Sequence, residues 1–234
     1  MNSKLYIHFL KTEKKLNPKM KELLEEVIKT HAANACSLLG IVYVNITVYS
    51  NPNFVIPETG EGGYAASGDW FQIYIDPAKS EDELNRIINI DIPLTIYHEL
   101  NHVTRWNSTG YGSTLPEAII TEGLASVFAA ENWEKAKSPW VKYSPEEINE
   151  LMKVYQNRDK NLDSDYSHGD WFYGTGDLPR WIGYKLGFHI VKMARENNPA
   201  VGWNKLINMT AEEIIKLSSC QVPIFLDTNS EIKK

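Results

Sequence analysis

Two histidines and a glutamate stand at the spacing that a catalytic zinc ion requires. His98 and His102 are four residues apart, and Glu99 follows the first of them, in the run HELNH. On an α-helix, residues four apart lie one above the other, so both imidazoles can bind one metal ion. Glu99 can then reach a water on that ion and take its proton. The run predicts two ligands and a general base, and a zinc site still needs a third protein ligand and an open fourth position.

Glu122 is the candidate for the third ligand. It lies in a second helical pattern that begins near Pro116, among mostly apolar neighbours. An ionised carboxylate in such a setting is costly unless it is paired or bound to metal. The polar turn at 107–113 is short, which makes the two helices antiparallel neighbours and returns Glu122 to the level of the histidines. The alternatives for the third ligand are Glu117, Glu131 and His168.

These residues resemble the gluzincin branch of zinc metallopeptidases, with its thermolysin-like arrangement. The likeness rests on HExxH followed by Glu122, 24 positions after His98. More narrowly, HELNHVTRW and TLPEAIITEGLASVF resemble a bacterial family of predicted zinc-dependent proteases, as does the later stretch Gly183–Val191. The likeness covers roughly residues 60–215. One position departs from the thermolysin pattern, because Ser126 stands where that pattern has an acid that holds the first histidine.

The resemblance implies a fold, a cofactor and a substrate class. The fold is zincin-like, with a small mixed sheet and a mainly helical C-terminal half. It forms a single domain over residues 1–234, with strands and the metal helix in a lobe over 1–106 and a helical lobe over 107–234. The cofactor is Zn²⁺, and the substrate is a peptide or protein.

Peptide hydrolysis also needs a surface that binds the extended substrate. An exposed sheet edge can do this by pairing with the substrate backbone. In zincin folds such an edge lies above the metal helix, and Phe71, Gln72 and Ile73, with the preceding run at 62–68, resemble it. The alternative is an ordinary core strand that follows a hairpin loop.

The developing oxyanion needs a hydrogen-bond donor. Tyr184 is the first candidate, because Gly183 and Gly187 leave space beside it on a predicted helix. His168, in a polar loop, is the second candidate. The alternatives are that the glycines only permit tight helix packing around a core tyrosine, and that His168 is a solvated loop residue.

The elements that must position these residues follow from caps and hydrophobic periodicity. Strands are predicted over residues 4–10, 42–49 and 69–76, and the stretch 51–67, rich in glycine and proline, is predicted to be a loop. Helices are predicted over 18–39 and 80–88, from Asp91 through the metal run, from Pro116, after Ser144, from Asp177 to about Glu196, and after Thr210. A few strands followed by many helices indicate the α+β class.

Composition bounds the function. The chain has 234 residues, 43% of them hydrophobic, which is enough for one sizeable core or one core with two lobes. A net charge of −6 argues against nucleic acid as the main partner. There is no membrane-spanning stretch of about eighteen apolar residues, and the apolar run within residues 1–10 is too short for a signal peptide. Cys36 and Cys220 are expected to be buried thiols. These features predict a cytoplasmic protein, and the oligomeric state is left open.

The sequence therefore predicts a zinc metallopeptidase with Glu99 as its base. Two alternatives remain. One is a non-proteolytic zinc hydrolase that acts on a small amide, because the same ligand set would serve it. The other is a zinc-bearing binding protein without turnover. Glu99 argues against the second alternative, since a purely structural zinc needs no base in that place.

Overall fold

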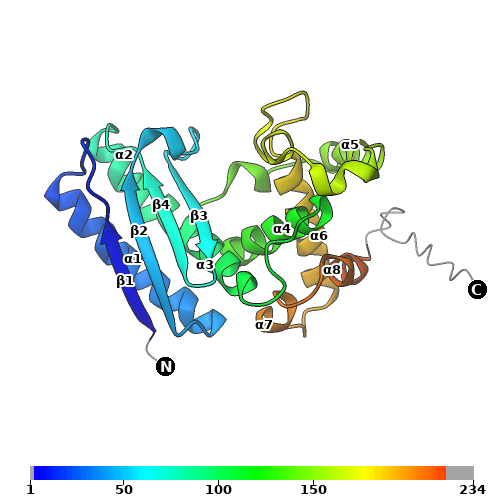
Figure 1. Ribbon diagram of the computed structural model, residues 1–234, viewed down its shortest axis with the longest axis horizontal. Coiled ribbons are helices and arrows are strands. Elements are labelled where there is room, and N and C mark those ends of the chain that lie inside the picture. The colour runs from blue at the N-terminus through cyan, green and yellow to red at the C-terminus, as the bar shows by residue number, and fades with distance from the viewer. Residues whose placement is uncertain (1–2, 220–234) are drawn as a thin grey trace, which may run out of the picture.

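The computed structural model describes residues 3–219 and shows an α+β architecture with a small mixed sheet, as predicted. The strands are β1 (Lys4–Phe9), β2 (Tyr43–Ser50), β3 (Glu61–Ser67) and β4 (Trp70–Ile75). Their order in the sheet is β1-β2-β4-β3, where β1, β2 and β4 run parallel and β3 runs antiparallel to β4 (Figure 1). This order places β3 at one edge of the sheet and β4 inside it.

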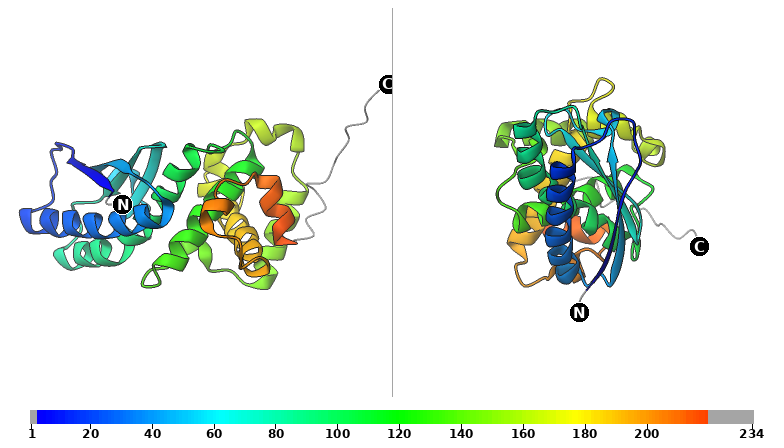
Figure 2. Two further views of the ribbon diagram at one scale, coloured as in Figure 1. Left: turned by 90° about the horizontal axis from the view of Figure 1, so that it is seen from below. Right: turned by 90° about the vertical axis from the view of Figure 1, so that its left-hand side faces the viewer.

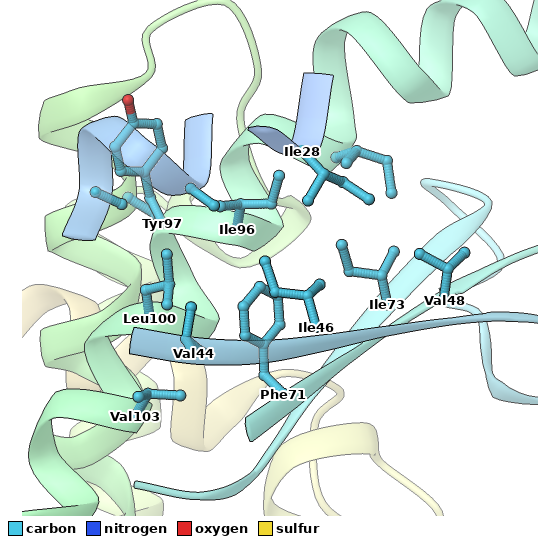
Figure 3. Packing of buried hydrophobic residues seen from close by; sticks show 14 of the residues in the cluster. Ile28, Val44, Ile46, Val48, Phe71, Ile73, Ile96, Tyr97, Leu100 and Val103 are labelled. Atoms are coloured by element: carbon cyan, nitrogen blue, oxygen red, sulfur yellow. The ribbon is translucent and has the colours of Figure 1, made fainter. Parts of the chain in front are cut away.

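Two helices cover one face of the sheet. Helix α1 (Pro18–Leu39) begins after Asn17, whose side chain accepts a hydrogen bond from the backbone N–H of Met20 at 2.9 Å. It ends at Gly40, which takes the left-handed conformation with φ of 72°, as the sequence predicts for a glycine stop. The helix α3 (Ile92–Trp106) lies beside α1 and carries the HELNH run. Figure 3 shows their apolar side chains meeting the strands.

The first hydrophobic core fills the space between the sheet and these two helices. Alternate residues of β2 and β4 point into it, and they include Ile46, Phe71 and Ile73, each fully buried. Ile28 of α1 and Leu100 of α3 meet them from the helical layer (Figure 3). Because strand side chains alternate between faces, this packing fixes the register of the sheet. It also fixes the face of α3 that turns away from the core.

Helix α2 (Glu81–Arg86) belongs to the first half, because its Leu84 lies in the first core. The helices of the second half are α4 (Leu115–Asn132), α5 (Pro145–Gln156), α6 (Ile182–Asn197), α7 (Trp203–Leu206) and α8 (Ala211–Ser218). The second cluster of buried residues draws on α4, α5, α6 and α8. Figure 2 shows this helical half beside the half that holds the sheet.

α4 and α6 approach each other closely because glycine faces glycine. A Cβ atom added at Gly123 of α4 would lie 2.8 Å from the Cα atom of Gly187 in α6, which is too close for any side chain. Gly183, one turn earlier, packs against the ring of Phe172 in the same way, with a Cβ 2.6 Å from Cε1. The space beside Tyr184 is thus used for helix packing, as one reading of the sequence expected.

Three predictions about elements need correction. The stretch 51–67 contains the edge strand β3 as well as a loop. Strand β4 is paired on both sides, so Phe71, Gln72 and Ile73 cannot offer a free edge to a substrate. The helix expected from Asp177 begins only at Ile182, because Trp181 takes a left-handed conformation with φ of 67° that interrupts it.

Two further expectations concern membranes and thiols. Within the described residues, no helix has both the length and the apolar character needed to cross a bilayer. Cys36 is buried in the first core, and burial raises the pKa of its thiol to about 12. Cys220 lies outside the described residues.

Candidate metal centre

Helix α3 presents its two histidines side by side. The Nε2 atoms of His98 and His102 are 3.0 Å apart, and the two rings meet edge to face at a centroid distance of 4.7 Å. The apolar face of α3, with Ile96, Leu100 and Val103, is buried against the sheet and α1. The histidines therefore lie on the part of the helix that turns toward α4, as the four-residue spacing predicts.

Helix α4 brings Glu122 to the histidines. Oε2 of Glu122 lies 3.1 Å from Nε2 of His98 and 3.4 Å from Nε2 of His102. A tetrahedral zinc ion with bonds of about 2.0–2.1 Å separates its ligand atoms by about 3.3 Å, so the three atoms lie close to the spacing that zinc needs. The imidazole and carboxylate donors also suit zinc. Among the described residues, these three form the group whose geometry fits a metal ion.

Two of the three alternative third ligands, Glu117 and Glu131, have other partners. Glu117 accepts hydrogen bonds from the backbone N–H groups of Ser113 and Thr114 and caps the start of α4. Glu131 pairs with Arg195 at 3.1 Å. Glu117 therefore acts as a cap, since one of its carboxylate oxygens accepts both backbone bonds.

Ser126 stands where the thermolysin pattern has an acid that holds the first histidine, and in this structure its side chain has another partner. Its hydroxyl accepts a hydrogen bond from the indole N–H of Trp140 at 3.0 Å, inside the second core. Ser126 therefore packs the helical half and does not hold His98. His102 Nδ1 is buried and has no hydrogen-bond partner within the described part of the chain.

Burial and the neighbouring charges shift the two central carboxyl groups in opposite directions. Burial raises the pKa of Glu99 to about 8, and the nearby carboxylates of Glu122 and Glu61 add to that rise. Burial acts in the same direction on Glu122, but the adjacent His102 and His98 outweigh it and hold the pKa of Glu122 well below its usual range. Glu122 is thus an anion ready to bind a cation, whereas Glu99 has an increased affinity for a proton.

Glu99 lies against the edge strand. A Cβ atom at Gly63 of β3 would lie 2.6 Å from Cγ of Glu99, so only glycine leaves room for this carboxylate. The backbone N–H of Ala65, two residues further along β3, interacts with the carboxylate and lowers its pKa. Strand β3, which lies in a stretch that the sequence predicted to be a loop, therefore positions the Glu99 carboxylate.

Two cavities meet over Glu99. One has a volume of about 360 Å³ and extends toward Glu61 and Phe54, and the other has about 400 Å³ and extends toward Tyr64 and His168. Both are lined by Gly63, His98, Glu99, Tyr173 and Tyr184. The site thus lies in the middle of a cleft between β3 and the helical half.

The two candidates for the oxyanion donor both reach this cleft. Tyr184 lines both cavities, while its ring stacks on Trp140 at 4.5 Å between centroids. His168 lines the second cavity and stacks on Phe172 at 4.3 Å, and burial lowers the pKa of its imidazole. His168 is therefore more enclosed than a solvated loop histidine. Which of them contacts a substrate stays a prediction.

The sequence analysis expected a free sheet edge at Phe71, Gln72 and Ile73, but these residues lie in β4, which is paired on both sides. Phe71 and Ile73 point into the first core, and β4 has no free edge. The outer edge of β3 lies beside the metal helix. Ile56 bridges its first residue, Glu61, and the indole N–H of Trp106 donates to the Ala65 carbonyl at 3.3 Å. Residues 62–68, which were grouped with β4 in the sequence, supply the edge that β4 was expected to form.

Tyr111 was missed by sequence reasoning. Its hydroxyl donates a hydrogen bond to Oε1 of Glu122 at 2.5 Å, and it lines the second cavity. The turn that carries it reads as a polar linker. The local signal was Gly110 and Gly112 on either side, both of which take positive φ angles and hold an aromatic residue in a fixed direction.

Comparisons with known proteins give one family and one relative. Residues 16–216 match the model of a family described as Predicted Zn-dependent protease (DUF2268). The chain is also 32% identical over 102 residues to a Bacillus subtilis (strain 168) protein named Uncharacterized protein YjaZ. That match covers 41% of this chain and 39% of the relative, so the chain spans about two fifths of the length of the curated relative it matches. No solved structure matches the chain.

Proposed function

We propose, from the premise that this chain belongs to the family of predicted Zn-dependent proteases, that it is a zinc-dependent peptidase with Glu99 as general base. The observation that carries the proposal is the triangle of His98, His102 and Glu122 donor atoms, with sides of 3.0–3.4 Å, next to the Glu99 carboxylate. The family description supports zinc dependence and proteolysis. The gluzincin type and the residue roles are part of the proposal.

His98, His102 and Glu122 would hold the ion. A zinc ion bound there supplies Lewis acidity to a peptide carbonyl and lowers the pKa of water. Glu99 takes the proton from the attacking water and delivers it to the leaving amine. Burial makes the ionised Glu99 carboxylate a stronger base than that of an exposed glutamate, and the charge of a bound zinc ion would favour this ionised form. Gly63 and Ala65 keep this carboxylate against β3 while it changes protonation.

The outer edge of β3 is proposed to bind the substrate backbone. Backbone pairing gives affinity, and side-chain cavities give specificity. The two cavities lie on opposite sides of Glu99 along β3, toward Glu61 in one direction and toward Tyr64 in the other. A chain bound along β3 would thus have subsites before and after the cleaved bond. This arrangement favours an extended peptide over a small amide.

Tyr184 is proposed to donate its hydroxyl to the oxyanion, with His168 as the second candidate. Tyr184 lines both cavities at the level of His98 and Glu99, where the cleaved carbonyl would lie. Stacking on Trp140 holds its ring, and its hydroxyl interacts with that of Tyr173, which also lines both cavities. His168 reaches only the second cavity.

Substitution of Glu99 tests the proposal. Glu99→Gln keeps the size and the ligands, so it should bind about one zinc per chain but lose cleavage of a peptide library by several orders of magnitude, because the base is gone. His98→Ala should lose the metal, since it removes one of three ligands. Elemental analysis measures zinc, and mass spectrometry of the digested library measures cleavage. Full zinc content in His98→Ala, or substantial cleavage by Glu99→Gln, would contradict the proposal.

A further inference from the structure

We infer that Tyr111 is a positioning residue that holds Glu122 so that a single carboxylate oxygen faces the metal site. The inference rests on the proposed function. The two oxygens of Glu122 have different neighbours: Oε2 lies 3.1 Å from Nε2 of His98, and Oε1 accepts the Tyr111 hydrogen bond at 2.5 Å. The hydroxyl therefore already occupies the oxygen that would otherwise be free to turn toward the ion.

The backbone around Tyr111 is fixed from two directions. Gly110 and Gly112 have φ angles of 76° and 98°, a region that other residues rarely adopt. The Thr121 hydroxyl donates to the Tyr111 carbonyl at 2.8 Å, and Nε of Arg105 donates to the Thr121 oxygen at 2.9 Å. Thr121 precedes Glu122 on α4, so the same helical turn carries both the ligand and the group that holds Tyr111.

The ring of Tyr111 is also held. It lies 5.7 Å from the His102 ring and 6.3 Å from the His168 ring, measured between centroids. A Cβ atom at Gly112 would overlap Cβ of Glu117, so the turn packs directly against the start of α4. The hydroxyl thus reaches Glu122 from a surface that is fixed before any metal binds.

Carboxylates bind metals through one oxygen or through both. A catalytic zinc site keeps one position for water and substrate in addition to its three protein ligands. If Glu122 turned both oxygens toward the ion, its second oxygen would occupy part of that open position. The Tyr111 hydroxyl prevents this and also orients the ligand. Residues that orient metal ligands typically change metal affinity or activity by about 10- to 100-fold when they are substituted.

The test is Tyr111→Phe, which removes the hydroxyl and keeps the ring. Two measurements report on the metal without any substrate: zinc affinity by competition with a chromogenic chelator, and the visible absorption spectrum of the protein loaded with Co²⁺. We expect zinc affinity to fall by about 10- to 100-fold. We also expect weaker Co²⁺ absorption bands, since the coordination number rises when Glu122 binds through both oxygens.

Tyr64→Phe is the matched control, because Tyr64 lines the same cavity and is 58% exposed. It should leave both metal measurements unchanged. Thr121→Val removes the hydroxyl that donates to the Tyr111 carbonyl. It should lower zinc affinity and weaken the Co²⁺ bands in the same direction as Tyr111→Phe, but by less. If Tyr111→Phe does not fold, the two metal measurements on Thr121→Val test the inference. A Co²⁺ spectrum identical to that of the wild type overturns the inference, whatever the affinity.

The outcomes for the two proposals differ. A wild-type protein that binds zinc but cleaves no peptide contradicts the peptidase proposal. The two metal measurements on Tyr111→Phe then still test the role of Tyr111, because they need no substrate. A wild-type protein that binds neither zinc nor Co²⁺ overturns both proposals. Cleavage by the wild type together with an unchanged Co²⁺ spectrum in Tyr111→Phe overturns only the role of Tyr111.

Discussion

Three buried carboxyl groups, those of Glu61, Glu99 and Glu122, lie near one another in the cleft, and their surroundings shift their pKa values differently. The imidazoles beside Glu122 keep it ionised, whereas burial raises the pKa of Glu99 to about 8 and that of Glu61 to about 7. Glu61 accepts a hydrogen bond from the Thr95 hydroxyl at 2.5 Å, one turn before His98 on α3. A site that collects this much buried acid favours a cation at its centre.

Glu61 should make stability depend on pH. Its pKa rises from about 4.5 unfolded to about 7 folded, so the folded protein holds the proton more tightly. The resulting stabilisation is complete below about pH 4.5 and is lost as the pH rises toward 7. Glu61→Gln removes this loss, so the variant should gain stability over the wild type between pH 5 and pH 8, by at most about 3 kcal/mol.

Urea unfolding of both proteins at pH 5 and pH 8 measures this difference. Glutamine keeps an oxygen that can accept the Thr95 hydrogen bond, so the comparison isolates the charge. A variant that is equally destabilised at both pH values would show that Glu61 titrates in the same way in the folded and unfolded chain.

Tyr184→Phe tests the proposed oxyanion donor. Removing such a donor typically lowers turnover by about 100- to 1,000-fold, because the hydrogen bond strengthens only in the transition state. The ring keeps its stacking on Trp140, so the fold and the zinc content should not change. Steady-state kinetics should show a fall in kcat with little change in KM. A variant with wild-type kcat would shift the role to His168, and His168→Asn would then be the variant to measure.

The HELNH run predicts two histidines on one helical face from local spacing alone, and the structure brings His98 and His102 together with Glu122. A four-residue separation specifies one helical face wherever the helix lies. Glu122 was identified because a charged residue in an apolar helix needs a partner. Tyr111 could not be found in this way, since its contact with Glu122 depends on how a turn folds back, and only Gly110 and Gly112 mark that turn.

The amino-acid composition of strand β3 is typical of a loop, which is why the sequence did not predict this strand. Its residues EGGYAAS contain two glycines and no β-branched residue, so they resemble a loop. The strand exists because it pairs with β4, and such pairing between segments is not visible in local propensity. The glycines that weaken the strand signal have a second role, since Gly63 gives Glu99 its space.

Gly63→Ala should therefore impair catalysis without loss of metal. The new Cβ would overlap the Glu99 carboxylate, and the base would have to leave its place against β3. Because a misplacement of about 1 Å can cost about 100-fold in rate, kcat should fall by that order. Gly202→Ala is the control, since a Cβ there meets no atom within 4 Å. Zinc content and kcat of the two variants are compared, and equal kcat values would contradict the role of Gly63.

The two hydrophobic cores place the ligands of the proposed metal on different parts of the protein. His98 and His102 belong to α3, which packs in the first core, whereas Glu122 belongs to α4, which packs largely in the second. Buried Arg105 adds a second link, because its guanidinium on α3 donates to the Ile207 carbonyl at 2.6 Å and to Thr121 of α4. A metal bound at this junction should stabilise the association of the two halves.

Removal of the metal should lower the melting temperature. An ion present at about 1,000 times its Kd contributes about 4 kcal/mol, which for a chain of this size corresponds to roughly 8–16 °C. Calorimetry with and without a chelator measures the shift. His98→Ala, which should bind no metal, is the control and should melt at the same temperature in both conditions. A chelator effect of equal size in His98→Ala would show that the stabilising ion binds elsewhere.

The sheet order and the docking of the two halves were beyond prediction from sequence. β4 and β3 read as a strand and a loop, and only the pairing of β4 with β2 shows that β4 is internal. The docking depends on contacts such as Arg105 with the Ile207 carbonyl, which join residues about a hundred positions apart. Periodicity and caps predicted most helices because those signals are local.

The glycine contact between α4 and α6 has a consequence for redesign of the cleft. Glu122 precedes Gly123, and Tyr184 lies one turn before Gly187, so the crossing of the two helices sets the separation of these side chains. No larger residue can enter at that crossing without moving one of them. Changes to what the cleft binds are therefore best confined to the opposite wall, where Phe54 and Tyr64 are exposed and can be exchanged without repacking a core.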